Sequence, residues 1–204
     1  MKKKNVLLMA LSMALVAVIS IGGTLAYLAA SDGAVTNTFT FASNLSVDLY
    51  ETINDEKVQT GYDFEDVVPG TPVDKDANFN MTNASVKSVV FVKIEAEDKS
   101  AGGKTGVDMI LDMTGTDLTA YGDIDDNGYG EYYIIVDKDD TTEKDIFSKV
   151  TAPATADTTL NVLNNVKISI SAVQYEGIEN VDYDTASEAD IVAAAYDAKP
   201  AYQA

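Results

Sequence analysis

Apolar and polar residues alternate along several segments of this chain, which is the pattern of β-strands that bury one face. In residues 39–49 the apolar side chains fall on odd positions, and in residues 89–97 and 165–175 valine, isoleucine and alanine alternate with lysine, glutamate and serine. Three shorter candidates are residues 77–81, 131–136 and 158–163. Clusters of Gly, Pro, Asn and Asp separate these segments, as expected for turns.

Six or more strands without long helices between them predict an all-β fold, an antiparallel β-sandwich or jelly roll. One short helix is predicted near the C-terminus, over residues 187–198, because Ser187 can cap it and two acidic residues follow near the positive end of its dipole. We expect a frayed terminal helix on the outside of the sandwich. Residues 27–178 are assigned to the β-sandwich domain, and residues 179–204 to an acidic C-terminal tail that carries the helix.

The first 30 residues have the layout of a secretory signal peptide. Lysines at positions 2–4 precede an apolar stretch over residues 6–21, which as a helix would span about 24 Å, less than the roughly 30 Å of a bilayer core. Two glycines at positions 22 and 23 then interrupt the helical pattern. We assign residues 1–26 to the signal peptide. The cleavage region comprises Ala26, Tyr27, Leu28, Ala29 and Ala30.

An uncleaved membrane anchor is the alternative, because no charged residue occurs between Lys4 and Asp32. Export would place the mature protein in the extracellular matrix or at the cell surface. Neither an LPxTG-type sorting signal nor a C-terminal apolar stretch is present, so we expect any retention at the surface to be non-covalent. Removal of residues 1–26 takes away three lysines and no acidic residue, which changes the formal charge from −19 to −22.

The composition excludes several kinds of chemistry. The chain contains no Cys and no His, and therefore lacks the side chains for the usual zinc sites, a thiol nucleophile or a Ser–His–Asp triad. An excess of 33 acidic over 14 basic residues argues against nucleic acid as a partner. Because the chain has so many acidic residues, the sequence does not identify any two of them as the catalytic pair of a glycosidase. We predict that the protein is not an enzyme and has no cofactor, and one loop is a candidate calcium site.

That loop, Asp-Ile-Asp-Asp-Asn-Gly at residues 123–128, matches the first half of a calcium-binding loop. In the second half, Ile134 stands where a bidentate glutamate is usual, and Glu131 is the nearest substitute. The candidate metal ligands are Asp123, Asp125, Asn127 and Glu131. The alternative is a β-hairpin whose turn is Asn127-Gly128, followed by an apolar strand. Both interpretations stay open on the sequence.

Several segments resemble one family in their order and spacing. They are Gly-Gly-Thr-Leu-Ala-Tyr at residues 22–27, the strand pattern of 36–49, Val-Pro-Gly at 68–70, Asn-Phe-Asn-Met-Thr-Asn at 78–83, and residues 166–177. Together they resemble the TasA/camelysin proteins, which Gram-positive bacteria export and cleave with a dedicated signal peptidase, SipW. The resemblance covers the signal region and about half of the mature chain.

This resemblance implies a jelly-roll sandwich, processing by a SipW-type signal peptidase, and a role in surface fibres or biofilm matrix, with other matrix components as further partners. Camelysin-type members have been labelled metalloproteases. Because this chain has no His and no His-Glu-x-x-His motif, we do not carry that activity over.

The segment after the cleavage region has the character of a strand that can pair with another copy. It is rich in Thr, Phe, Val and Leu, and no charged residue occurs between Asp32 and Asp48. One interpretation is an ordinary first strand of the sandwich. The other is that its end, released by cleavage, pairs with the sheet edge of a neighbouring subunit and extends a filament head to tail. The strand-donor residues are Thr36, Thr38, Phe39, Phe41, Leu45, Val47 and Leu49.

We therefore predict a secreted structural protein, a homo-oligomeric subunit of surface fibres or biofilm matrix that assembles by N-terminal strand donation. The alternative is a monomeric surface module that binds a glycan or host ligand through exposed tyrosines. Tyr129, Tyr132 and Tyr133 are the candidates for such stacking.

Overall fold

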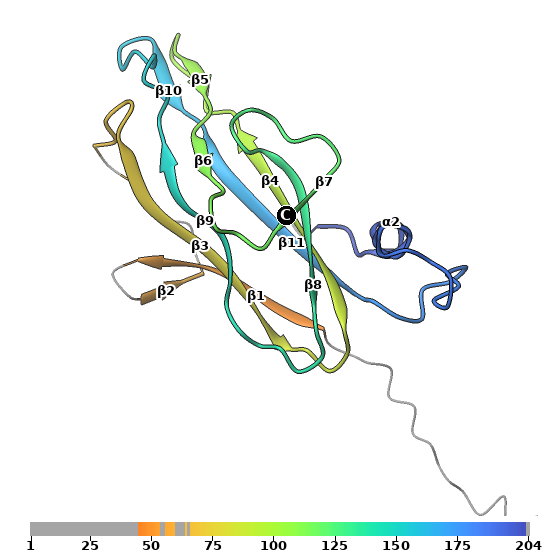
Figure 1. Cartoon of the computed structure of the whole chain (residues 1–204). Helices are drawn as coiled ribbons and strands as arrows, with labels where there is room; N and C mark the ends of the chain where they lie inside the picture. Colours follow the sequence, from red (N-terminus) through yellow and green to blue (C-terminus); the bar gives the residue numbers. More distant parts are fainter. Residues whose placement is uncertain (1–44, 54–55, 60–63, 65, 203–204) are drawn as a thin grey trace, which may run out of the picture. The chain divides into compact units, whose positions relative to one another are not determined.

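The computed structural model describes residues 45–53, 56–59, 64 and 66–202. All of them belong to one compact unit. They form mainly antiparallel β-sheets packed face to face, with one short helix near the C-terminus (Figure 1). The predicted all-β sandwich with a short C-terminal helix is confirmed.

One sheet has five strands in the order β2-β1-β3-β9-β6, and every neighbouring pair in it is antiparallel. Its strands are β1 (Ser46–Ile53), β2 (Glu56–Val58), β3 (Pro72–Asn83), β6 (Ile110–Asp112) and β9 (Lys144–Thr151). The central strand β3 begins at Pro72, five residues before the predicted segment 77–81. Its ladder with β1 covers Ser46–Thr52, whereas β2 reaches only Glu51–Ile53.

The second sheet has four strands in the order β11-β4-β8-β7, again antiparallel. Its strands are β4 (Ser88–Glu97), β7 (Thr119–Tyr121), β8 (Gly130–Val136) and β11 (Asn165–Gln174). Two short strands, β5 (Thr105–Val107) and β10 (Asn161–Leu163), form a separate parallel pair. The strand predicted at 158–163 is therefore limited to its last three residues.

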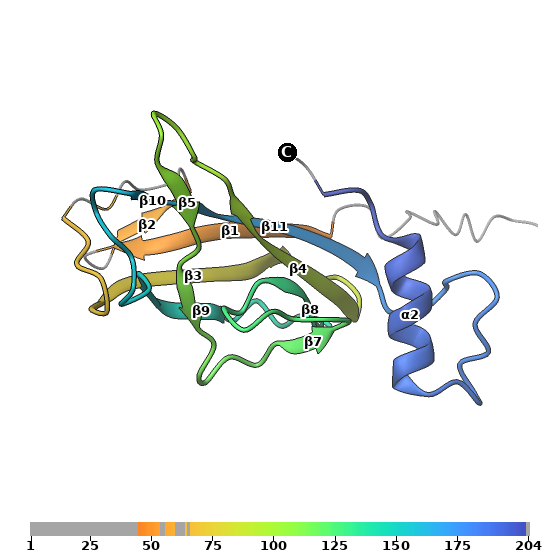
Figure 2. The same ribbon diagram turned by 90° about the horizontal axis from the view of Figure 1, so that it is seen from above.

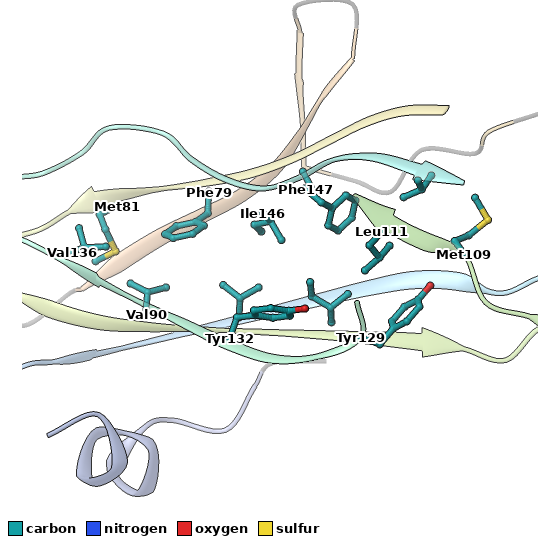
Figure 3. Close-up of a cluster of buried hydrophobic side chains, with 14 of the residues drawn as sticks. Phe79, Met81, Val90, Met109, Leu111, Tyr129, Tyr132, Val136, Ile146 and Phe147 are labelled. Carbon is teal, nitrogen blue, oxygen red and sulfur yellow. The ribbon is translucent and has the colours of Figure 1, made fainter. Parts of the chain in front are cut away.

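The main core lies between the two larger sheets, where their inward side chains meet (Figure 3). From the five-stranded sheet come Phe79, Met81, Leu111, Ile146 and Phe147, and from the four-stranded sheet come Val90, Val92, Ile94, Tyr132 and Val136. All are less than 8% exposed. The period-2 pattern of β4 and β11 correctly predicted their inward faces, because alternate side chains of a strand point to opposite sides of a sheet.

The helix α2 (Glu188–Ala198) covers part of the outer face of the four-stranded sheet and creates a second, smaller core (Figure 2). Ser187 caps the helix, as predicted, and in addition forms a capping box with Asp190. The expected fraying is wrong: Ile191, Val192 and Ala195 are at most 4% exposed. Within the described ranges, no helix has both the length and the apolar character needed to cross a membrane.

This packing explains why the first half of β4 is buried on both faces. Val90 and Val92 face the main core, whereas Val89 and Phe91 point outward and lie beneath α2. A strand that is covered on both faces has a continuous run of apolar residues in its sequence, and residues 89–92 form such a run.

Candidate functional site

The edges of the two sheets come together where β1 and β11 lie side by side (Figure 2). β11 pairs with β4 on one side only, and no described strand pairs with its other side. The first half of β1 is similar, because β2 pairs with that strand only from Glu51 onward. In the described part of the chain, the sandwich therefore has an open side bounded by two strand edges.

The hydrogen-bond register shows which backbone groups β11 offers at its open edge. The N–H of Tyr175 donates to the carbonyl of Lys87 at 2.8 Å, in line with the antiparallel ladder of β11 and β4. Hydrogen-bonded and non-hydrogen-bonded pairs alternate along such a ladder, so the odd residues of β11 point their backbone groups toward β4. The N–H and C=O groups of Val166, Ile168, Ile170 and Ala172 point the other way, toward the open edge.

A groove of about 410 Å³ runs along this open side. Its walls are Leu45–Val47 and Leu49 from β1 and its approach, Ile168–Ala172 from β11, and Pro200 and Ala201 from the C-terminal segment. The side chains of Ile168, Ile170 and Ala172 also pack against the main core. The groove thus combines apolar side chains with a row of backbone groups that no described strand pairs with, and these are the two features that bind an added β-strand.

Two smaller cavities continue the groove along β1 toward its C-terminal end, with volumes of about 270 and 360 Å³. Glu51 lines both. Its carboxylate forms an ion pair with Lys75 of β3, and the two side chains are only 15% and 9% exposed. Lys75 Nζ also lies 5.2 Å from the centre of the Phe64 ring. The groove is therefore apolar at the start of β1 and contains a buried ion pair at its far end.

Three of the strand-donor residues, Leu45, Val47 and Leu49, lie in this groove wall and pack against the core of their own chain. Val47 and Leu49 pair with Met81 and Phe79 of β3. The interpretation as an ordinary first strand therefore holds for this part. The other donor residues (Thr36, Thr38, Phe39 and Phe41) and the cleavage region (Ala26, Tyr27, Leu28, Ala29 and Ala30) lie outside the described residues.

The candidate calcium ligands include two carboxylates that are engaged in other hydrogen bonds, those of Asp125 and Glu131. The Asp125 carboxylate accepts hydrogen bonds from the N–H groups of Asn127 and Tyr129, both at 2.9 Å, and thereby shapes the turn. Glu131 accepts a hydrogen bond from Tyr196 on the outer face of the sheet. Neither Asp123 nor Asn127 has a side-chain hydrogen bond in the described structure, and no group of three or more acidic residues there is arranged to hold a metal. Calcium binding stays a prediction.

The hairpin interpretation of the same loop is right in its pairing and wrong in its turn. β7 and β8 pair antiparallel, with Ala120 opposite Tyr132. The connection is the longer segment 122–129, in which the Gly128 N–H donates to the Asp125 carbonyl. Gly128 has φ +91°, a left-handed conformation that glycine adopts without strain. Asn127-Gly128 therefore does not form a two-residue turn.

Two of the three tyrosines considered for ligand stacking are core residues. Tyr129 and Tyr132 are 7% and 6% exposed, and the Tyr132 hydroxyl donates to the Gly128 carbonyl at 2.9 Å. Burial raises the pKa of Tyr129 to about 12. Only Tyr133 lies on the outer face, where its ring centre is 6.4 Å from that of Tyr121. The rings of Tyr129 and Tyr132 are thus not available to a ligand.

The open edge of β11 could not be inferred from its own residues, because alternation shows which face is buried and not which strands are neighbours.

No protein-family model, curated protein or solved structure matches this chain.

Proposed function

We propose that this protein is a secreted subunit of surface fibres or biofilm matrix. In this proposal, the segment before β1 of one copy adds as a strand to the open side of the next copy. The observation that supports it most directly is the groove, with its apolar side chains, beside the edge of β11 that no described strand pairs with. An edge of this kind favours pairing with another chain, because its N–H and C=O groups gain partners that they lack in the isolated subunit.

The proposed occupant of the groove is the segment between the cleavage region and Leu45 of a second copy. It contains Thr-Phe-Thr-Phe at residues 38–41 and no charged residue after Asp32. An uncharged strand with alternate aromatic side chains suits a groove lined by Ile168 and Ile170, where a charged side chain would lose its hydration. Main-chain hydrogen bonds would supply affinity, and the alternate side chains would supply specificity.

The position of the donor explains how a filament would grow. The donated residues lead directly into Leu45 and β1, and β1 is itself one wall of the acceptor groove. Each copy therefore carries both a donor segment and an acceptor groove. Such head-to-tail contacts do not pair two copies symmetrically, and they extend into a filament wherever the rotation between neighbours does not close a ring.

Processing by a signal peptidase of the SipW type would act as the switch in this scheme, as the resemblance to TasA/camelysin proteins implies. Before cleavage, the donor segment is tethered to the membrane by residues 1–26. After cleavage it can reach another subunit. We assign the protein no catalytic role and place it in the extracellular matrix or at the cell surface.

The experiment compares the secreted mature protein with two variants by electron microscopy and sedimentation. The first begins at Asn44 and lacks the donor. The second is Ile168→Lys, which places a charge in the groove, and its control is Thr141→Lys, which adds the same charge at an exposed loop position. We expect filaments from the mature protein and from Thr141→Lys only.

Mixing the two defective variants gives a further test. The shortened protein keeps an acceptor and Ile168→Lys keeps a donor, so they should form a heterodimer at most and no filament. Filaments from either variant alone would contradict strand donation. A mature protein that stays monomeric at all concentrations would contradict the fibre function, including the case in which the donor segment fills its own groove.

A further inference from the structure

The chain that follows α2 turns back toward β11 and reaches the rim of the groove. The carbonyl of Pro200 accepts a hydrogen bond from the Ser171 hydroxyl at 3.0 Å. Pro200 and Ala201 line the groove opposite β1. Ser169 and Ser171, both on the outer face of β11, are only 7% and 6% exposed. The C-terminal segment, defined as Lys199–Tyr202, therefore lies against the strand whose free edge borders the groove.

Side chains rather than backbone pairing hold this segment in place. The Tyr202 ring packs into the outer core that α2 forms on the sheet. Lys199 Nζ lies 4.3 Å from the centre of that ring and 4.2 Å from the centre of the Tyr196 ring. Between the described residues of the segment and β11 there is no backbone–backbone hydrogen bond. Within the described residues, the outer edge of β11 thus has no backbone partner while the segment is docked.

Few contacts dock this segment. The docking depends on one side-chain hydrogen bond, two cation–π contacts and the burial of one ring. The Tyr202 hydroxyl is buried close to the Glu131 carboxylate without a hydrogen bond of good geometry, which costs part of the energy gained by burying the ring. Pro200 and Ala201 themselves remain exposed. A strand that pairs with the full edge of β11 makes contacts that this segment does not.

We infer that the C-terminal segment is a strap that shields the acceptor groove in the isolated subunit and is displaced when a donor strand binds. This inference rests on the proposed function, and it identifies a control built into the same site. Pro200 and Ala201 form part of the groove wall without pairing with the strand edge, so the strap restricts entry of a donor strand and slows association, while the final, fully paired state stays favoured. Release of the strap should therefore speed filament growth.

The test measures the rate of seeded filament elongation by light scattering, using the full mature protein and three variants. One variant ends at Ala198, so that α2 is kept and the strap is removed. Tyr202→Ala loosens the strap, and its matched control is Tyr202→Phe, which keeps the ring and removes only the buried hydroxyl. We expect the first two variants to elongate about five- to tenfold faster, the scale of one lost hydrogen bond and one lost ring contact. Tyr202→Phe should elongate no faster than the unmodified protein.

Equal rates for all four proteins would overturn the strap while leaving the fibre function intact, and slower growth after truncation would show that the segment is a required wall of the groove. Absence of filaments from every protein would overturn the fibre function and the strap with it. If truncation impairs folding, Ser171→Ala provides a milder release, because it removes only the donor to Pro200. Carboxypeptidase should also release Tyr202 faster from filaments than from monomers, and the reverse order would contradict displacement.

Discussion

The hydroxyl of Tyr196 on α2 donates a hydrogen bond to the carboxylate of Glu131 on β8. The same ring stacks on Tyr121 with 4.4 Å between ring centres, and it meets the edge of Phe91 at 5.3 Å. Tyr196 therefore attaches the C-terminal helix to the outer face of the four-stranded sheet. It also uses the carboxylate that the calcium interpretation needs as a ligand.

This contact predicts a loss of helix docking in alkali. The hydrogen bond to Glu131, followed by burial, raises the pKa of Tyr196 to about 12. The phenol ionises near 10 in the unfolded chain, so its stabilising contribution is complete below that pH and disappears as the pH rises to about 12. Chemical unfolding followed by circular dichroism should show stability falling across this range. Tyr196→Phe should be less stable at pH 8 and should decline less steeply, and an unchanged slope would contradict the assignment.

The loop between β8 and β9 predicts that the folded state loses stability in acid. Hydrogen bonds from the Thr142 hydroxyl and the Lys144 ammonium lower the pKa of Asp140 to about 2. The carboxylate thus stabilises the folded state above pH 4, and this contribution is lost as the pH falls toward 2. Asp140→Asn should reduce the free energy of unfolding at pH 7 by about 1 kcal/mol. It should also make that free energy depend less on pH between pH 4 and 2.

Asp139→Asn is the matched control for that experiment. It removes the same charge from the adjacent position, whose side chain makes no hydrogen bond in the described structure. Asp139 has φ +65°, a left-handed conformation that asparagine tolerates as well as aspartate does. Its stability should stay close to that of the unmodified protein. An equal loss of stability in both variants would mean that net charge, rather than the hydrogen bonds of Asp140, determines how stability falls in acid.

The register of β11 predicts that proline at one position blocks assembly without unfolding the sandwich. The N–H of Ala172 points away from β4, and proline lacks this group. Proline is tolerated in edge strands where the missing N–H faces outward. Ala172→Pro should retain the circular dichroism spectrum of the sandwich and lose filament elongation. Ala172→Ser keeps the N–H and should elongate normally, whereas normal elongation of Ala172→Pro would exclude the β11 edge as the acceptor.

The sequence predicted which face of a strand is buried better than it predicted which strands pair or which partners particular polar residues have. Alternation in residues 165–175 correctly gave the inward face of β11, because that periodicity is local. The outward burial of Val89 and Phe91 depends on α2, which is distant in the sequence. For the same reason, nothing near Glu131 indicated that its carboxylate would pair with Tyr196. The groove requires two strand edges that only the three-dimensional arrangement brings together.

The charge of the proposed mature chain leads to a final prediction, which concerns the effect of salt and divalent cations on assembly. If the proposed signal peptide is removed, the formal charge is −22, so the proposed subunits should repel one another and growth should accelerate with salt, since the screening length falls to about 10 Å at 0.1 M. Because Asp125 bonds to its own turn and Glu131 to Tyr196, we expect calcium and magnesium to act equally at matched ionic strength. Elongation rates in the two salts test this. A larger effect of calcium that Asp125→Asn abolishes would instead identify the 123–131 loop as a calcium site, and rates independent of salt would contradict the electrostatic barrier.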